Sequence, residues 1–265
     1  MVLRMRIFKR EKIRSIPIIG VRNAGKTYFI VSLGHLISKE GWGEVLTYDY
    51  FHQLEPYVLA QQPIPPTVGY HPVRVRVDYV EYQNKRFNAR IVLSTGDISG
   101  IEFEQAMQEV KTFKFSKKSD LKNAPPTLGK LYRLLLNSDG LIVLIDITKY
   151  LSEVTHIADA VFRAFSYQIE PISTALEMVI NFGKFSLKPL FFVFSKQDIH
   201  KLTVNNIRRY FQNAWAILLR RLERRLVNIK LYTVSAVGWS DNPEERLKAR
   251  GFDKLLFDLV RSFQD

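Results

Sequence analysis

Cysteine is absent from the 265-residue sequence, which excludes disulfide bridges, thiolate zinc sites and cysteine nucleophiles. Long apolar runs are absent too, and none approaches the roughly 18 residues that a membrane-spanning helix needs. The opening MVLRMRIFKREKIR is basic, and Arg and Lys interrupt its apolar residues, unlike those of a secretory signal. We therefore expect a cytoplasmic protein whose contact with a membrane, where it occurs, is peripheral.

Acidic residues are comparatively few, with 26 Asp and Glu against 39 Lys and Arg, which gives a formal net charge of +13. This excess favours phosphate-rich partners such as nucleotides, RNA or an anionic membrane surface. Apolar residues make up 46% of the chain and aromatic residues 12%, which is enough to fill a buried core. A disordered chain is thereby excluded.

Short β-like runs alternate with longer helical ones, a pattern typical of a parallel sheet covered on both faces. Strands are predicted at 14–20, 73–82, 86–95, 141–147, 190–195 and 229–235. Helices are predicted at 26–39, 102–112, 127–138, 151–180, 203–226 and 244–263. The expected fold class is α/β, with a six-stranded, mostly parallel sheet.

The second and third strands are predicted to form a hairpin, because VRVRVDYVEY largely alternates and QNK supplies a turn. This hairpin would place one antiparallel strand at the edge of the sheet. Pro17 lies within the first predicted strand, where a missing backbone donor is costly. We expect it at the start of the strand, with Ile18 and Ile19 making the pairing.

A single domain is predicted over 1–265, preceded by a basic extension at 1–13 within that range. Two segments look like insertions: the aromatic-rich stretch at 41–66 and the basic, Pro-terminated stretch at 113–126. Loops of this kind usually lie on the surface and carry function. Both are expected on the mobile side of the site.

The string GVRNAGKT matches GxxxxGK[ST] and lies between an apolar strand and a helix, as a phosphate-binding loop does. Glycines let the backbone turn its amides toward phosphate oxygens, and the helix N-terminus adds positive potential. Lys26 would bridge the terminal phosphates, and Thr27 would offer its hydroxyl to magnesium. The nucleotide-binding candidates in this loop are Gly20, Val21, Arg22, Asn23, Ala24, Gly25, Lys26 and Thr27.

A second group of candidates points to magnesium and a terminal phosphate. Asp97, in IVLSTGDISG, can hold magnesium through water, and Gly100 can present its amide to a γ phosphate. Thr67, in PPTVGYHPV, can reach the magnesium with its hydroxyl. The five histidines have no convincing metal-ligand spacing, so Mg2+ is the only metal predicted. Its candidate ligands are Thr27, Thr67 and Asp97.

The stretches FFVFSKQD and LYTVSAV supply groups that can read a base. The carboxylate of Asp198 can accept hydrogen bonds from N1 and N2 of guanine, a donor pair that adenine lacks. Lys196 can lie along the base, and the amide of Ala236 can donate to O6. The base-binding candidates are Ser195, Lys196, Asp198, Ser235, Ala236 and Val237.

These elements follow one another in order, each at the carboxyl end of a predicted strand or in a loop, where open α/β sheets bind ligands. In this respect the chain resembles the P-loop GTPases of the Ras, Arf and Rab kind over about 14–263. PTVGYHPV is similar to their first switch and DGLIVLIDITK to their fourth strand. The resemblance implies a GTP/GDP switch in which Thr67 and Gly100 contact the γ phosphate, with protein regulators or effectors at the switch regions.

Three departures from that family bear on activity. Ile101 occupies the position of the usual water-orienting Gln, so hydrolysis is expected to be slow unless a neighbouring side chain or a partner compensates. Arg22 replaces a small residue and is a candidate catalytic residue that acts in cis. Two alternatives remain: its side chain blocks an incoming Arg from an activator, or it points into solvent. Ser195 and Val237 replace Asn and Lys, and Ser195 is expected to hydrogen-bond to the phosphate loop with shorter reach. Guanine selectivity should survive with reduced affinity.

Two alternatives stay open. One is an ATPase that uses Asp146 as its magnesium residue, because LIVLID closes an apolar run with an acid; it leaves SKQD and SAV unexplained. The other is a pseudo-GTPase binding module at a membrane or RNA surface. The cations of the first twelve residues alternate with apolar residues and are the better candidate for an anionic membrane. No dedicated nucleic-acid module is evident.

Overall fold

The first predicted strand is interrupted at its proline. In the computed structural model, which describes residues 12–60, 62, 70–113, 118–181, 189–210, 216, 228–236 and 250–263, it forms β1 (Lys12–Ser15) and β2 (Ile18–Gly20). Pro17 lies between them and has no N–H to donate, but its carbonyl accepts a hydrogen bond from the amide of Ile142 at 3.1 Å. The expectation that pairing resumes at Ile18 is confirmed.

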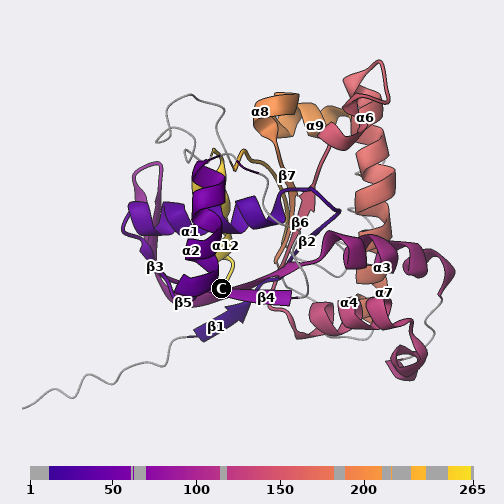
Figure 1. The fold of residues 1–265 in the computed structure, drawn as a ribbon, viewed down its shortest axis with the longest axis horizontal. Helices are drawn as coiled ribbons and strands as arrows, with labels where there is room; N and C mark the ends of the chain where they lie inside the picture. Colours follow the sequence, from indigo (N-terminus) through magenta and orange to yellow (C-terminus); the bar gives the residue numbers. More distant parts are fainter. Residues whose placement is uncertain are drawn as a thin grey trace, which may run out of the picture.

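The sheet of the described chain has the order β3-β4-β5-β2-β6-β7-β8, with β1 paired to β5 (Figure 1). The remaining strands are β3 (Gly43–Val45), β4 (Tyr70–Tyr82), β5 (Lys85–Ile98), β6 (Leu141–Ile145), β7 (Pro189–Phe194) and β8 (Asn228–Thr233). The α/β, mostly parallel fold class is confirmed. The predicted number of six strands is wrong for the described residues, which form eight, because the first strand is split and β3 is added. β4 is antiparallel as predicted, but β3 takes its place at the edge.

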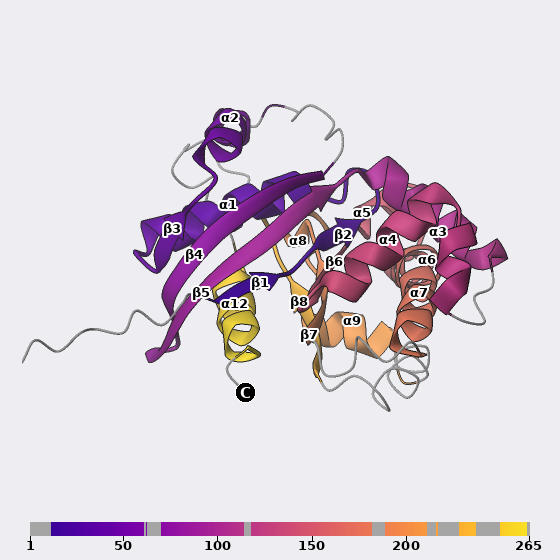
Figure 2. The same cartoon turned by 90° about the horizontal axis from the view of Figure 1, so that it is seen from below.

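The β4–β5 hairpin is confirmed. Gln83 and Asn84 have φ values of 50° and 61°, the left-handed conformation that a two-residue turn uses to match the twist of its strands. Tyr82 pairs with Lys85 across this turn. The hairpin forms the long arm of the sheet seen in Figure 2.

Helices cover both faces of the sheet. α1 (Lys26–Lys39) and α12 (Phe252–Arg261) lie on one face, where the rings of Phe29 and Phe252 pack with centroids 4.7 Å apart. α3 (Gly100–Thr112), α4 (Pro126–Asn137), α6 (Ile157–Ala164) and α7 (Glu170–Asn181) lie on the other (Figure 2). Shorter helices are α5 (Thr148–Leu151), α8 (Gln197–His200) and α9 (Val204–Tyr210). Within the described ranges, no helix is long and apolar enough to cross a membrane.

The two predicted insertions contain regular structure. The segment at 41–66 includes β3 and α2 (Tyr48–Leu59), which packs outside α1 (Figure 2). The segment at 113–126 includes a 3-10 helix, η1 (Lys118–Asn123), and reaches the start of α4. Of the predicted helices at 203–226 and 244–263, the described residues contain α9 and α12, and the rest lies outside them.

The single helix predicted at 151–180 is wrong. α5 ends at Leu151 and α6 begins at Ile157, after an extended residue, His156, with φ −117° and ψ 134°. A π-helical turn, η2 (Phe165–Ile169), then separates α6 from α7. Such a turn adds a residue to the helix and rotates the side chains that follow, often at functional positions. Gln168 lies within this turn and is buried, with 1% of the residue exposed.

Candidate functional site

The predicted phosphate loop leaves β2 and enters α1 with the backbone that its sequence implies. A Cβ on Gly20 would lie 2.6 Å from the carbonyl oxygen of Leu144, so only glycine fits against β6. Asn23 and Gly25 have φ values of 63° and 86°, which turn the chain tightly into the helix. The amide of Ala24 donates to the carbonyl of Val21 at 3.2 Å and closes the turn.

Lys26 folds back over this loop. Its Nζ donates to the carbonyl oxygens of Gly20 at 3.0 Å and Val21 at 3.1 Å, and the residue is buried. An ammonium group held against the loop, at the N-terminus of a fourteen-residue helix, makes a site for a polyanion. Thr27 follows in the first turn of α1, as predicted.

Gly100 lies directly on the phosphate loop. A Cβ there would lie 2.5 Å from Cα and 2.6 Å from the amide nitrogen of Arg22. Asp97 lies on β5, three residues before Gly100. It pairs through its backbone with Ile18 of β2, the strand that leads into the loop. The structure thus brings together the loop and the D-x-x-G stretch, which are about 75 residues apart in sequence. Thr67, Val237 and the side chain of Asp97 lie outside the described part.

Magnesium fits the donor types at this edge. Thr27 offers a hydroxyl and Asp97 is a carboxylate residue, and hard oxygen donors supplemented by phosphate and water are what Mg2+ prefers. Among the described residues, no group of three or more His, Cys, Asp or Glu side chains could hold a metal ion without such help.

A pocket of about 210 Å3 opens beside the loop, at the carboxyl ends of β7 and β8. One wall comes from the loop and α1, including the ring of Tyr28. The other walls carry four of the predicted base-binding residues. The pocket is lined by Ala24, Gly25, Tyr28, Phe29, Ser195, Lys196, Asp198, Ile199, Val234 and Ala236.

The polar groups of this pocket are fixed by hydrogen bonds. Oδ1 of Asp198 accepts from the hydroxyl of Ser235 at 2.5 Å, which holds the carboxylate in one orientation. Ser32, in the second turn of α1, donates to the carbonyl of Ala236 at 2.7 Å and ties this segment to the phosphate-loop helix. Ser235 also exchanges two backbone hydrogen bonds with Arg250. The predicted residues Asp198, Ser235 and Ala236 therefore lie together and are held by hydrogen bonds to one another, to α1 and to Arg250.

Ser195 does not donate its hydroxyl proton to the phosphate loop, contrary to expectation. It is buried, and its hydroxyl donates to the carbonyl of Ile145 in β6 at 3.2 Å. The short Ser side chain reaches the neighbouring strand instead. The link between the base-reading segment and the loop comes from Ser32, which the sequence reading missed.

His200 is hydrogen-bonded to the segment that follows β7, which carries Ser195 and Lys196. Its Nε2 donates to the carbonyl of Ser195 at 3.1 Å and its Nδ1 accepts from the amide of Leu202 at 3.0 Å, so the ring is neutral. Burial lowers the pKa of His200 below its usual 6.5, although Ser195, Asp198 and Asp146 oppose the shift. A protonated ring would lose its acceptor and the bond to Leu202.

Stability should therefore fall on acidification. Just below pH 6.5 the unfolded His takes up a proton and folded His200 does not, so the unfolded state gains protons. We expect the free energy of unfolding to drop from about pH 6.5 downward, by up to about 1.4 kcal/mol per pH unit until the folded ring titrates. Denaturant titrations from pH 7.5 to 5 would measure it. His200→Gln should flatten this slope and His156→Gln, at an exposed site, should not; equal slopes in all three proteins would refute this origin.

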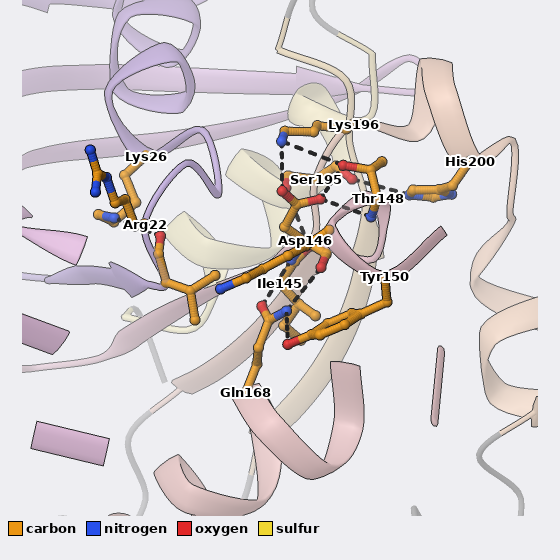
Figure 3. Close-up of polar contacts among 12 residues, drawn as sticks. Arg22, Lys26, Ile145, Asp146, Thr148, Tyr150, Gln168, Ser195, Lys196 and His200 are labelled. Carbon is orange, nitrogen blue, oxygen red and sulfur yellow. Dashed lines mark hydrogen bonds and ion pairs between the residues drawn. The ribbon is translucent and has the colours of Figure 1, made fainter. Parts of the chain in front are cut away.

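Asp146 is the centre of a buried polar cluster beside the pocket (Figure 3). Its Oδ2 accepts from Nζ of Lys196 at 2.6 Å, and its Oδ1 accepts from the amide of Thr148 at 2.9 Å and from its hydroxyl at 2.6 Å. Gln168 clamps the backbone of Asp146, accepting from its N–H at 3.0 Å and donating to its carbonyl at 2.9 Å. The cluster fixes the position of Lys196 along the pocket.

Several of these supporting residues carry no sequence motif. Ser32 and Tyr28 lie within a predicted helix and are read as ordinary helix positions. Gln168 also lies within a predicted helix, and its contact with Asp146 depends on how that helix packs. Asp146 does carry a sequence signal, as an acid that closes the apolar run LIVLI, but the signal suggests a magnesium ligand of an ATPase and not a support for the pocket.

No protein-family model matches the sequence, and no curated protein matches it either. Among solved structures, the Ski7 GTPase-like domain of S. cerevisiae, bound to GTP, matches with a TM-score of 0.50 and 12% identity over 95% of this chain and 50% of that one. The signal recognition particle receptor SRb of Chaetomium thermophilum, from its GTP-bound complex with SRX, gives 0.47 and 14% over 89% and 96%. Elongation factor SelB of Methanococcus maripaludis, with the GTP analogue GPPNHP, gives 0.44 and 13% over 96% and 34%.

The match to Ski7 shows the fold. This chain has the α/β fold of the P-loop GTPases in a divergent form, as the order of its motifs predicted. The chain spans about half the length of the Ski7 chain and about a third of the SelB chain. What it binds has to be argued from its own site.

Proposed function

We propose that this chain is a GTP-binding protein with slow, magnesium-dependent GTP hydrolysis that acts as a nucleotide-dependent molecular switch. The observation that carries the proposal is the pocket between the phosphate loop and Asp198. It joins a polyanion site to a carboxylate held in place by Ser235. A phosphate loop alone would fit many nucleotides, whereas this pairing is specific to one type of base.

Guanine suits the pocket better than adenine does. A carboxylate can accept from N1–H and N2–H of guanine at once, and charge-assisted hydrogen bonds of this kind are strong. Adenine presents an unprotonated N1 beside a C–H, so it would leave the carboxylate unpaired in a half-buried pocket, at a cost. Tyr28 and the stem of Lys196 give the base two broad surfaces to lie between.

The phosphate side supplies the groups for slow hydrolysis. Lys26 and Gly100 are proposed to contact the terminal phosphate, and Thr27, Thr67 and Asp97 to hold magnesium. Bound magnesium would neutralise charge on the phosphates. Arg22, whose side chain is exposed at the mouth of the loop, is the candidate for a cation acting in cis.

The contacts of Asp146 weigh against an ATPase that uses it as a magnesium residue. Its side chain is 3% exposed, and both carboxylate oxygens accept hydrogen bonds from Lys196 or Thr148. A metal ligand in this position would have to abandon the ion pair with Lys196. Asp146 is better explained as a support for the base pocket.

Hydrolysis should accelerate when a water-orienting side chain is restored. Ile101 lies in the first turn of α3 and its side chain is 55% exposed, so it has room for a polar replacement. Ile101→Gln is expected to raise single-turnover GTP hydrolysis by about tenfold, because an amide can orient and polarise the attacking water. Phosphate release under single-turnover conditions would measure it. Ile101→Leu is the matched control, and equal rates in all three proteins would refute this role for position 101.

Competition tests the proposed ligand. A fluorescent GDP derivative bound to the full chain should be displaced by GTP and GDP at far lower concentrations than by ATP. Displacement by ATP at the lower concentration would refute the proposal and favour the ATPase.

We further propose that the protein is cytoplasmic. Its regulators or effectors are proposed to bind near Gly100 and Thr67, and its basic segment at 1–12 is proposed to contact anionic membranes.

A further inference from the structure

Glu104 connects α3 to the phosphate loop. Its Oε1 accepts a hydrogen bond from the backbone N–H of Arg22 at 3.2 Å and lies 3.1 Å from Nζ of Lys149. The same helix touches the same loop residue a second time, through Gly100 at its N-terminus. α3 is therefore fastened to the loop by one backbone contact and one carboxylate.

This carboxylate occupies an unusual position, because the amides of a phosphate loop serve to bind anions. Glu104 already supplies an anion to one of them. A hollow of about 370 Å3 lies on the same side, lined by three cations and two acids: Arg22, Lys149, Lys196, Glu104 and Asp146, together with Asn23 and Thr148. Asp146 forms an ion pair with Lys196. Glu104 is therefore the acid that would compete with an incoming anion for Arg22 and Lys149.

A diphosphate and a triphosphate differ at this point. In the proposed binding mode, the α and β phosphates would extend from the base pocket into the loop, and a third phosphate would continue toward Gly100 and the loop residue on which it packs. That residue is Arg22, whose amide holds Glu104. Two like charges brought close together repel, and the repulsion grows where water is partly excluded.

We propose that Glu104 is a specificity-determining residue that lowers the affinity of this site for GTP relative to its affinity for GDP. Arrival of the third phosphate displaces the Glu104 carboxylate from the amide of Arg22, and α3 loses one of its two attachments to the loop. Lys149 keeps Glu104 paired after its release, since its ammonium lies beside the same oxygen. The inference rests on the proposed function and adds to it the group that separates the two nucleotide states.

The test is a comparison of two glutamates on one helix. Glu104→Gln keeps the size and the acceptor oxygen and removes the charge. Glu102→Gln makes the same change two residues earlier, where the carboxylate pairs with Lys130 at 2.8 Å instead of with the loop. Dissociation constants for GDP and a non-hydrolysable GTP analogue would be measured by calorimetry, in magnesium, for the full chain and both variants.

We expect Glu104→Gln to lower the ratio of the GTP-analogue constant to the GDP constant by about fivefold, the scale of one partly exposed charge interaction. Glu102→Gln should change it less than twofold. In the GDP complex, Glu104→Ala should also speed amide hydrogen exchange over residues 100–112, because it removes the attachment itself. An unchanged ratio in Glu104→Gln, or an equal change in Glu102→Gln, overturns the inference and leaves the proposed function standing. Failure of the unmodified chain to bind either guanine nucleotide overturns both.

Discussion

Replacing Asp198 by Asn should lower the affinity for GDP and GTP by about a hundredfold or more. Two charge-assisted hydrogen bonds to the base are lost or weakened, each worth about 1.5–3 kcal/mol. The amide nitrogen of Asn would in addition face the N2 donor of guanine. The fold should be kept, because the Asn carbonyl can still accept from the hydroxyl of Ser235, as Oδ1 of Asp198 does.

The same substitution should improve binding of xanthine nucleotides, which carry an oxygen in place of the N2 amine. An Asn side chain can donate to that oxygen while accepting from N1–H. Calorimetric titration with GDP and XDP would measure both effects, with Asp253→Asn, an exposed site on α12, as the control. If Asp198→Asn binds GDP as well as the unmodified chain does, the base does not lie against this carboxylate.

Among the substitutions proposed for this protein, removal of the Asp146 side chain should lower the free energy of unfolding most. Asp146→Ala leaves the ammonium of Lys196 and the amide and hydroxyl of Thr148 without the acceptor they share. Breaking a buried ion pair from one side costs about 3–5 kcal/mol. Lys196 is 31% exposed and can be partly solvated, so we expect about 3 kcal/mol here.

Thermal unfolding would measure this loss as a drop of about 6–12 °C for a chain of this length. The matched control is Glu153→Ala, which breaks an exposed ion pair between Glu153 and Arg163 at 2.8 Å. This substitution should lower the free energy of unfolding by less than about 1 kcal/mol. Asp146→Asn should lie between the two, because an amide still accepts from Thr148. Equal melting temperatures for Asp146→Ala and Glu153→Ala would show that the buried cluster does not support the fold.

The phosphate loop and the fold class could be predicted because their signals are local. Gly20 and Gly25 are required by backbone geometry within a few residues, and the structure bears out both, through the close approach of Leu144 and a left-handed φ. The alternation of strands and helices likewise gives the parallel sheet. The order of the base-reading motifs needs nothing beyond the rule that ligands bind at the carboxyl ends of strands.

The supporting contacts could not be predicted, because each depends on distant parts of the chain. Ser195 is expected to reach the loop, but its hydroxyl donates to Ile145 of the neighbouring strand β6. Gln168 reaches Asp146 from a π turn 22 residues further along the chain, and neither the turn nor the contact has a sequence signature here. Glu104 carries no motif, and its contact with Arg22 depends on how α3 packs on the loop. The motifs therefore indicate candidate ligand-contacting groups, whereas the contacts that position those groups depend on the packing of distant segments.

The most direct measurement is the identity of the nucleotide that the protein selects. The full chain, freed of bound nucleotide, would be equilibrated in magnesium with equimolar GTP and ATP, separated from free nucleotide, denatured and analysed by chromatography. The geometry around Asp198 and Lys26 predicts guanine nucleotide at close to one equivalent and almost no adenine nucleotide. Recovery of adenine nucleotide in equal or greater amount, or of neither, would contradict it.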